Sequence, residues 1–364
     1  MYEGRTLQEL ATEVMRRAEA KRDFVAPINS MQLVEHDGVD EPLFQMEGVD
    51  GAFGVQEMFR KQLADRMGVP ERWSAKMFDD YPDLFRDTFN YLFDNYRNKK
   101  GQEPTQLVRT LDDGARAFLS NSYRPLDNED LAEIIIPKLE SVDAKIVSCE
   151  ITDRRMYLKA TTERVTGEVK QGDIVQGGLV ISNSEVGAGS LKIEPLMYRL
   201  ACLNGMIVAE AAMRKAHVTS KYFGGDGASE FFKDDTRRKT DDAFWSQVRD
   251  TVDAVLTQET FDVIVGRARA ATQEVLNADP IQVVEVFAKE EGLIEREKNS
   301  VLKHLIQGND ISKWGLVNAV TSASKEADNY AHATEMERLG GKVMEYAPSK
   351  FSALSRIANK GKGE

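Results

Sequence analysis

Cysteine and histidine are scarce in this sequence, which has two cysteines and four histidines among 364 residues. Two cysteines do not form a disulfide framework, and we expect Cys149 and Cys202 to be buried free thiols within strands. The sequence contains no HExxH or CxxC motif, and no histidine lies within one helical turn of another. This spacing disfavours a zinc site, which needs several ligands close together.

Long apolar runs are also missing, since no stretch approaches the ~20 residues that a membrane-spanning helix needs. The first residues lack the basic and then apolar pattern of a secretory signal, because Glu3, Glu9 and Glu13 interrupt them. We therefore expect a cytoplasmic protein that has no membrane partner.

Motifs for nucleotide binding and for common catalytic chemistry are missing as well. The chain has neither the GxxxxGK[ST] phosphate loop nor the GxSxG nucleophile elbow. Residues 224–227 are rich in glycine, but they do not connect a strand to a helix as a dinucleotide-binding turn does, so we interpret them as a loop. The sequence thus indicates no cofactor and no catalytic residue.

The net charge of −12 disfavours general coating of nucleic acid, but the charge is unevenly distributed. Residues 151–240 sum to +3, whereas residues 1–150 sum to −10 and residues 241–300 sum to −7. Because salt confines electrostatic fields to about 8–10 Å, a local basic groove in an acidic protein can still bind a polyanion.

The spacing of apolar residues predicts an α+β fold, with an antiparallel sheet core and packed helices, followed by a helical C-terminal region. We expect residues 1–24 to form an N-terminal helix, opened by a capping box of Thr6 and Glu9. Residues 25–235 are expected to form the sheet-centred core and residues 240–345 the helical region. Residues 346–364 are expected to form a basic flexible tail.

The turn residues Asp112-Asp113-Gly114 and Asp153-Arg154 predict two hairpins within the core. The elements expected in chain order are short strands over 30–50, helices over 55–97, a hairpin over 105–120, a helix over 127–139, a hairpin over 144–161, and strands over 174–182 and 190–203. The helices expected after them are one marked by Phe244, Val248, Val252 and Val255, and others over 258–277, 280–290, 295–306 and 311–338.

The first hairpin and the segment after it carry arginines interleaved with aromatic rings, namely Arg109, Arg116, Tyr123 and Arg124. Strand alternation places Arg116 and Phe118 on one side of the hairpin. Such surfaces suit single-stranded nucleic acid, because guanidinium groups hold phosphates and rings stack on bases. The alternative is that Phe118 belongs to the core and that the arginines pair with Asp112, Asp127 or Glu129.

Two further basic clusters are candidate nucleic-acid contacts. One cluster occupies alternate positions of a predicted strand, so its side chains line one face: Arg155, Tyr157 and Lys159. This face is either a nucleic-acid contact or an ordinary solvated face of the sheet. The other cluster borders the glycine-rich loop and contains Arg214, Lys215, Arg237 and Arg238. It is either a phosphate contact or a linker. The glycine turn at residues 185–190 is either a tight β connection or a set of amides that grip phosphate.

Adjacent carboxylates occur at Asp112-Asp113 and at Asp234-Asp235. A two-metal nuclease needs several carboxylates that converge from different strands. Solvated turns account for both pairs, so the sequence predicts no metal site, although a metal-dependent nuclease remains an alternative.

Three segments carry a resemblance: ARAFLSNSYRPLDNEDL at 115–131, NSEVGAGSLKIEPLMYRLACLNGM at 183–206 and WGLVNAVTSASKEADN at 314–329. They resemble a family of phage and plasmid proteins that is described as a domain of unknown function, family 932. Leu203 stands where a small polar residue is commoner in that family. The resemblance implies a mobile-element origin and the cytoplasm of a host cell, and it carries over no catalytic residue.

The order of hairpin, helix and further strands is also similar to that of single-strand annealing proteins of the RecT, Redβ and Erf kind. This second resemblance implies a homo-oligomer that lays single-stranded DNA along a basic groove. We therefore expect a protein that binds and anneals single-stranded DNA without ATP, and that is not an enzyme. The alternative is a protein-interaction or anti-defence factor whose acidic segments at 35–50 and 241–300 meet a basic host or phage protein.

Overall fold

The computed structural model describes residues 1–36, 38–97, 101, 103–208, 213–215 and 234–360. It confirms the α+β class, with two mainly antiparallel sheets and a helical C-terminal region. The first sheet has the strand order β1-β5-β6-β4-β3-β2, in which only β4 and β6 pair in parallel among the described strands. Its strands are β1 (Lys21–Pro27), β2 (Met31–His36), β3 (Val39–Met46), β4 (Phe53–Val55), β5 (Thr105–Leu111) and β6 (Gly114–Ser120).

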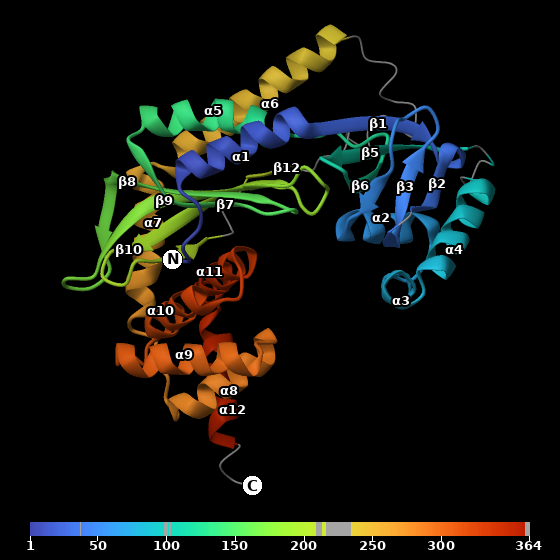
Figure 1. Ribbon diagram of the computed structural model, residues 1–364. Helices are drawn as coiled ribbons and strands as arrows, with labels where there is room; N and C mark the ends of the chain where they lie inside the picture. Colours follow the sequence, from blue (N-terminus) through green and yellow to red (C-terminus); the bar gives the residue numbers. More distant parts are fainter. Residues whose placement is uncertain (37, 98–100, 102, 209–212, 216–233, 361–364) are drawn as a thin grey trace.

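Three helices pack on the first sheet and complete what we call the first lobe (Figure 1). They are α2 (Glu57–Met67), α3 (Glu71–Asp80) and α4 (Pro82–Asn95). The stripe of Phe85 and Phe89 on α4 is fully buried and meets Phe44 and Phe59 in an aromatic core, as the helical spacing predicts. α2 ends at Gly68, whose φ of 72° gives the left-handed cap that glycine favours.

The second sheet is a meander with the order β11-β10-β9-β8-β7, and β12 also pairs with β10. Its strands are β7 (Ala144–Ile151), β8 (Met156–Glu168), β9 (Ile174–Asn183), β10 (Leu191–Arg199), β11 (Asn204–Ile207) and β12 (Met213–Lys215). The turns around Asp112 and Asp153 connect β5 to β6 and β7 to β8, so both predicted hairpins are confirmed.

Helices cover both faces of the second sheet and complete the second lobe (Figure 1). One face carries α1 (Leu7–Ala20), α5 (Asn128–Ser141) and α6 (Asp234–Val255). The other face carries α7 (Gln258–Ala271), α10 (Lys313–Ala323) and α11 (Tyr330–Met344). A further layer of helices packs beneath these and not on the strands: α8 (Pro280–Glu291), α9 (Glu295–Gly308) and α12 (Pro348–Lys360). The predicted capping box of Thr6 and Glu9 opens α1.

Several local expectations differ from the structure. The helix expected over residues 1–24 ends at Ala20, and Lys21–Pro27 form β1. Residues 311–338 form two helices, α10 and α11, because Asn329 caps a new helix by accepting a hydrogen bond from the His332 amide. The tail expected to be flexible from residue 346 contains α12, since Phe351 and Leu354 are spaced to bury one helical face. Cys149 is buried in β7 as expected, but Cys202 is half-buried and lies in the turn before β11.

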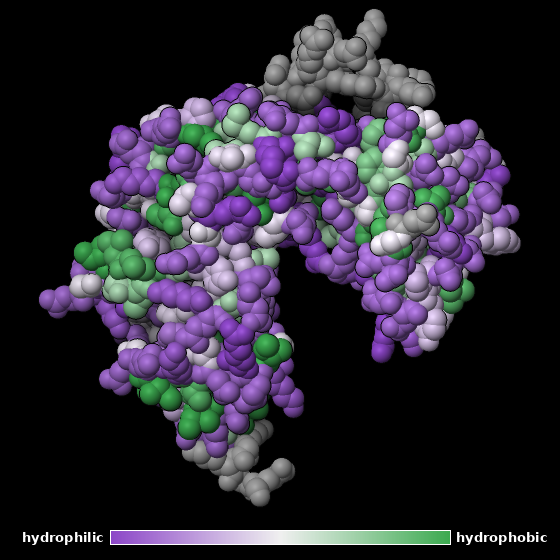
Figure 2. Space-filling model, viewed as in Figure 1, coloured by the Kyte–Doolittle hydropathy of each residue, from purple (hydrophilic) through white to green (hydrophobic). Residues whose placement is uncertain are grey.

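The two lobes are joined along one side and are separated by a hollow on the other, which Figure 2 shows as a deep notch in the surface. β1 follows α1 directly, so this continuous segment runs from the second lobe into the first (Figure 1). In the described part of the chain, no helix is both long enough and apolar enough to cross a membrane.

Candidate functional site

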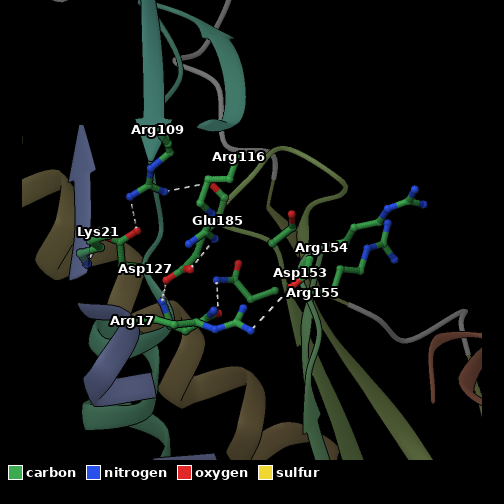
Figure 3. Close-up of polar contacts among 12 residues, drawn as sticks. Arg17, Lys21, Arg109, Arg116, Asp127, Asp153, Arg154, Arg155 and Glu185 are labelled. Carbon is green, nitrogen blue, oxygen red and sulfur yellow. Dashed lines mark hydrogen bonds and ion pairs between the residues drawn. The ribbon is translucent and has the colours of Figure 1, made fainter. Parts of the chain in front are cut away.

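Arg109 lies in the interior at the joint between the lobes, with only 2% of its surface exposed (Figure 3). Its guanidinium donates hydrogen bonds to Asp23 at 2.8 Å, to Asp127 at 2.7 Å and to the Glu185 carbonyl oxygen at 2.8 Å. Burial raises the pKa of Asp127, but the charges of Arg109 and Lys21 outweigh it and hold this pKa below its ordinary value. The guanidinium therefore fixes the two lobes together, as the pairing alternative expected, and is not on the surface.

Arg116 also points into the joint, where it pairs with Glu185 at 2.8 Å and both side chains are 5% exposed. The other carboxylate oxygen of Glu185 accepts a hydrogen bond from the Asn128 amide. Arg116 has no Cα partner in β5, because the register shifts around it in a bulge. The expectation that it shares a side with Phe118 is therefore wrong: Phe118 packs in the aromatic core, while Arg116 turns towards the second lobe.

Tyr123 and Arg124, the other two candidates of this segment, are half-buried. The Tyr123 hydroxyl donates to the Ser184 carbonyl oxygen at 3.3 Å, and its ring packs against Leu107, Leu119 and Val186. Burial raises the pKa of Tyr123. Arg124 also interacts with neighbouring groups of the protein. The turn that follows β9 is thus held against the first lobe.

Tyr157 and Lys159 share one face of β8, as expected, but α11 covers this face. Lys159 is fully buried, lies 2.5 Å from Glu337 and sits 4.7 Å from the centre of the Tyr330 ring. Burial lowers the pKa of Lys159, and the charge of Glu337 opposes this shift. The Tyr157 ring packs on Tyr330 at a centroid distance of 5.4 Å and is 2% exposed. The prediction that Tyr157 and Lys159 contact nucleic acid is therefore wrong, and so is the alternative of a solvated face, because α11 buries both side chains.

Arg154 and Arg155 differ from these buried cations, since they point away from the ion pairs of the joint (Figure 3). They form the tip of the β7–β8 hairpin. Arg154 is exposed and pairs with Glu57 of α2 at 2.6 Å. Arg155 is half-buried, and its Nε donates to the Ala188 carbonyl oxygen at 3.1 Å, which fixes its guanidinium against the glycine turn.

This hairpin tip forms one wall of a cleft of about 860 Å³ between the lobes, which we call the interlobe cleft. α2 contributes the opposite wall, and the first turns of α11 contribute a third. Its lining residues are Gln56, Glu57, Met58, Thr152, Asp153, Arg154, Arg155, Tyr157, Ala188, Asn329, Ala331, His332 and Glu335. Guanidinium, imidazole, amide and carboxylate groups thus face one solvent-accessible space, and the carboxylates are those of Glu57, Asp153 and Glu335. The Tyr157 ring lies beneath this space and is almost fully buried.

The electrostatics of the interlobe cleft are mixed. Hydrogen bonds from Lys61 and then Arg154 lower the pKa of Glu57 to about 2, so its carboxylate is ionised at neutral pH. Because exposed ion pairs contribute only about 0–1 kcal/mol, an incoming anion can replace Glu57 at Arg154 at little cost. The His332 ring nitrogen Nε2 donates a hydrogen bond to the Glu297 carboxylate at 2.6 Å, which holds the imidazole at the rim. The cleft can therefore bind a polar or anionic ligand through its hairpin wall.

The remaining candidate residues are Arg214 and Lys215 in β12, and Arg237 and Arg238 in α6. Their side chains lie outside the described part of the chain, as do residues 224–227. Among the described residues, no group of three or more histidine, cysteine, aspartate or glutamate side chains is placed to hold a metal ion.

Sequence reasoning identified Arg155 and Tyr157 but missed the walls of the cleft supplied by α2 and α11. Asp153-Arg154 was a detectable signal, because a hairpin turn places its residues at the end of a sheet. Met58, Asn329 and His332 gave no signal, since they meet the hairpin only through tertiary packing.

The fold and the cleft define a two-lobed α+β protein whose candidate binding site lies between its sheets. The family model described as Domain of unknown function (DUF932) matches residues 117–338, which is more than half of the chain, so the chain belongs to this family. The match includes the hairpin and α11 walls of the cleft and excludes α2. No curated protein and no solved structure matches the chain.

Proposed function

We propose that this protein binds single-stranded DNA in the interlobe cleft and anneals it as an oligomer, without ATP and without catalysis. The observation that carries the proposal is the hairpin tip, where two adjacent arginines face a cleft of about 860 Å³ between the lobes. Guanidinium groups bind phosphates, and the neighbouring, half-buried Met58 offers apolar surface for bases.

The buried cations have a supporting role in this proposal. Arg109 and Arg116 hold the joint between the lobes, and Lys159 holds α11 against β8. Each therefore fixes the position of a cleft wall and does not touch the strand. The annealing role and the oligomer extend this proposal from the order of elements in the sequence, which is similar to that of annealing proteins of the RecT, Redβ and Erf kind. The cytoplasm of a phage or plasmid host is proposed as the place of action on the same ground.

Equilibrium binding of a labelled oligothymidine strand, followed by fluorescence anisotropy across a salt series, tests this function. We expect binding at low salt, stronger than to a duplex, and a slope of log affinity against log salt near −1.4. This slope follows from two phosphate contacts at about −0.7 each. The absence of single-strand binding at low salt would overturn the proposal, and so would magnesium-dependent cleavage of the strand, which indicates a nuclease.

A further inference from the structure

A second concave surface lies on the opposite face of the second sheet, between α1 and α5. It is a mainly apolar groove of about 370 Å³, which we call the α1–α5 groove. Met156 and Leu158 of β8 form its floor, whereas Tyr157 between them faces the interlobe cleft. Because side chains alternate across a sheet, the groove and the cleft are separate sites on opposite faces.

The walls of the groove leave large apolar side chains in contact with solvent. Met15 and Leu7 of α1 are 64% and 40% exposed, and Ala132 and Ile136 of α5 are half-buried opposite them. Exposed apolar surface that is contiguous and concave marks interaction sites more often than scattered apolar residues do. The volume is near the lower end of the range of about 300–1,000 Å³ for ligand pockets, which suits a few anchoring side chains.

Acidic groups border this apolar surface. Glu129 and Glu133 of α5 line the groove, and its described lining contains no lysine or arginine. Burial, followed by the charges of Asp127 and other nearby acids, raises the pKa of the adjacent Asp130. Lys21 lies 3.9 Å from Glu129, but it is bonded to Asp127 at 2.6 Å.

The backbone of α5 adds to this negative border. Pro137 lies inside the helix and has no N–H group, so the carbonyl oxygen of Glu133 lacks its usual helical donor. A carbonyl acceptor and two carboxylates therefore lie beside the apolar walls, where they favour cationic side chains and disfavour an anionic lipid surface.

We propose that the α1–α5 groove binds a basic amphipathic helix of a partner protein. Apolar side chains at positions i, i+3 or i+4 and i+7 fill the groove, and flanking lysines or arginines meet Glu129 and Glu133. Charge complementarity selects this occupant, because an acidic helix or a second copy of acidic α5 would place like charges together at the rim.

A synthetic helical peptide tests this site without knowledge of the natural partner. The probe is a labelled leucine–lysine peptide with leucine at amphipathic helical spacing, titrated with the full chain and followed by anisotropy. We expect binding to this peptide, and affinity at least about tenfold lower for a scrambled peptide of equal composition or a leucine–glutamate peptide. Equal binding of the scrambled peptide would overturn the proposal.

Variants of α5 locate the binding. We expect E129Q/E133Q to weaken peptide binding about tenfold, because two ion pairs at the rim are lost. A132W should abolish binding by filling the groove, whereas E140Q, an exposed acid on the same helix outside the groove, should bind as the wild type does. If neither E129Q/E133Q nor A132W changes the affinity for the leucine–lysine peptide, the peptide does not bind in the α1–α5 groove. Oligothymidine affinity should be the same in all three variants, which separates this site from the cleft and reports correct folding.

Discussion

The R154E/R155E variant is expected to bind oligothymidine at least about 100-fold more weakly than the wild type. Charged hydrogen bonds contribute about 1.5–3 kcal/mol each, and every 1.4 kcal/mol is a factor of ten in affinity. Introduced carboxylates also repel phosphate. Anisotropy at low salt measures the effect, and thermal unfolding reports whether the loss of the bond from Arg155 to Ala188 has disturbed the fold.

R164E is the matched control for this prediction. Arg164 lies on the same strand as the hairpin, is exposed and pairs with Asp143, but it lies outside the interlobe cleft. R164E changes the net charge in the same direction and should lower affinity only slightly. R154E alone keeps the hydrogen bond from Arg155 to Ala188. It should therefore show only part of the loss of oligothymidine affinity that R154E/R155E shows. An equal loss in R164E, or none in R154E/R155E, would show that the cleft does not hold the strand.

The K159M variant is expected to lower the free energy of unfolding by about 3–5 kcal/mol, because it leaves the Glu337 carboxylate buried without its partner. The double variant K159M/E337L removes both charges and should recover most of this loss, since apolar groups of similar size fill the space. Urea denaturation followed by circular dichroism measures both values.

The ion pair of Lys145 and Glu163 provides the comparison, because both side chains are mostly exposed, at 75% and 72%. K145M should change the free energy of unfolding by about 0.5 kcal/mol or less. If K159M changes the free energy of unfolding as little as K145M does, Lys159 is not buried beneath α11. If the double variant is no more stable than K159M, loss of packing and not an unpaired charge accounts for the effect.

Local signals in the sequence were sufficient for much of the fold. The Phe85 and Phe89 spacing identified a buried helical face, and Asp112-Asp113-Gly114 and Asp153-Arg154 identified two hairpin turns. Each of these features depends on residues that are close in the chain. They predict element type and the antiparallel pairing, and hence the α+β class.

Burial of the cations could not be derived in the same way. Strand alternation places Tyr157 and Lys159 on one face, but it does not tell whether water or a helix covers that face. The cover is α11, and the partner of Lys159 lies 178 residues away. Similarly, β5 is buried on both faces because helices pack on one and the second lobe on the other. Arg109 therefore resembles a surface arginine in sequence while it bridges two lobes.

The prediction for the C-terminal segment was wrong for a different reason, because the sequence did carry the signal for burial. Lysines, glycine and asparagine in the last residues favoured a flexible tail, whereas Phe351, Leu354 and Ala358 place one helical face of α12 in the core. Their spacing was visible in the sequence. Basic composition concealed it, because the charged residues occupy the other face of the same helix.

The most direct test of the central claim is to map where a bound strand lies. Photo-crosslinking of an oligothymidine carrying a photoreactive base, followed by mass spectrometry, locates the contact on the intact protein. We expect crosslinked peptides from residues 152–157 and 329–335, the hairpin and α11 walls of the interlobe cleft. Crosslinks confined to α1 and α5 on the opposite face of the sheet, with none from the hairpin tip, would contradict the account.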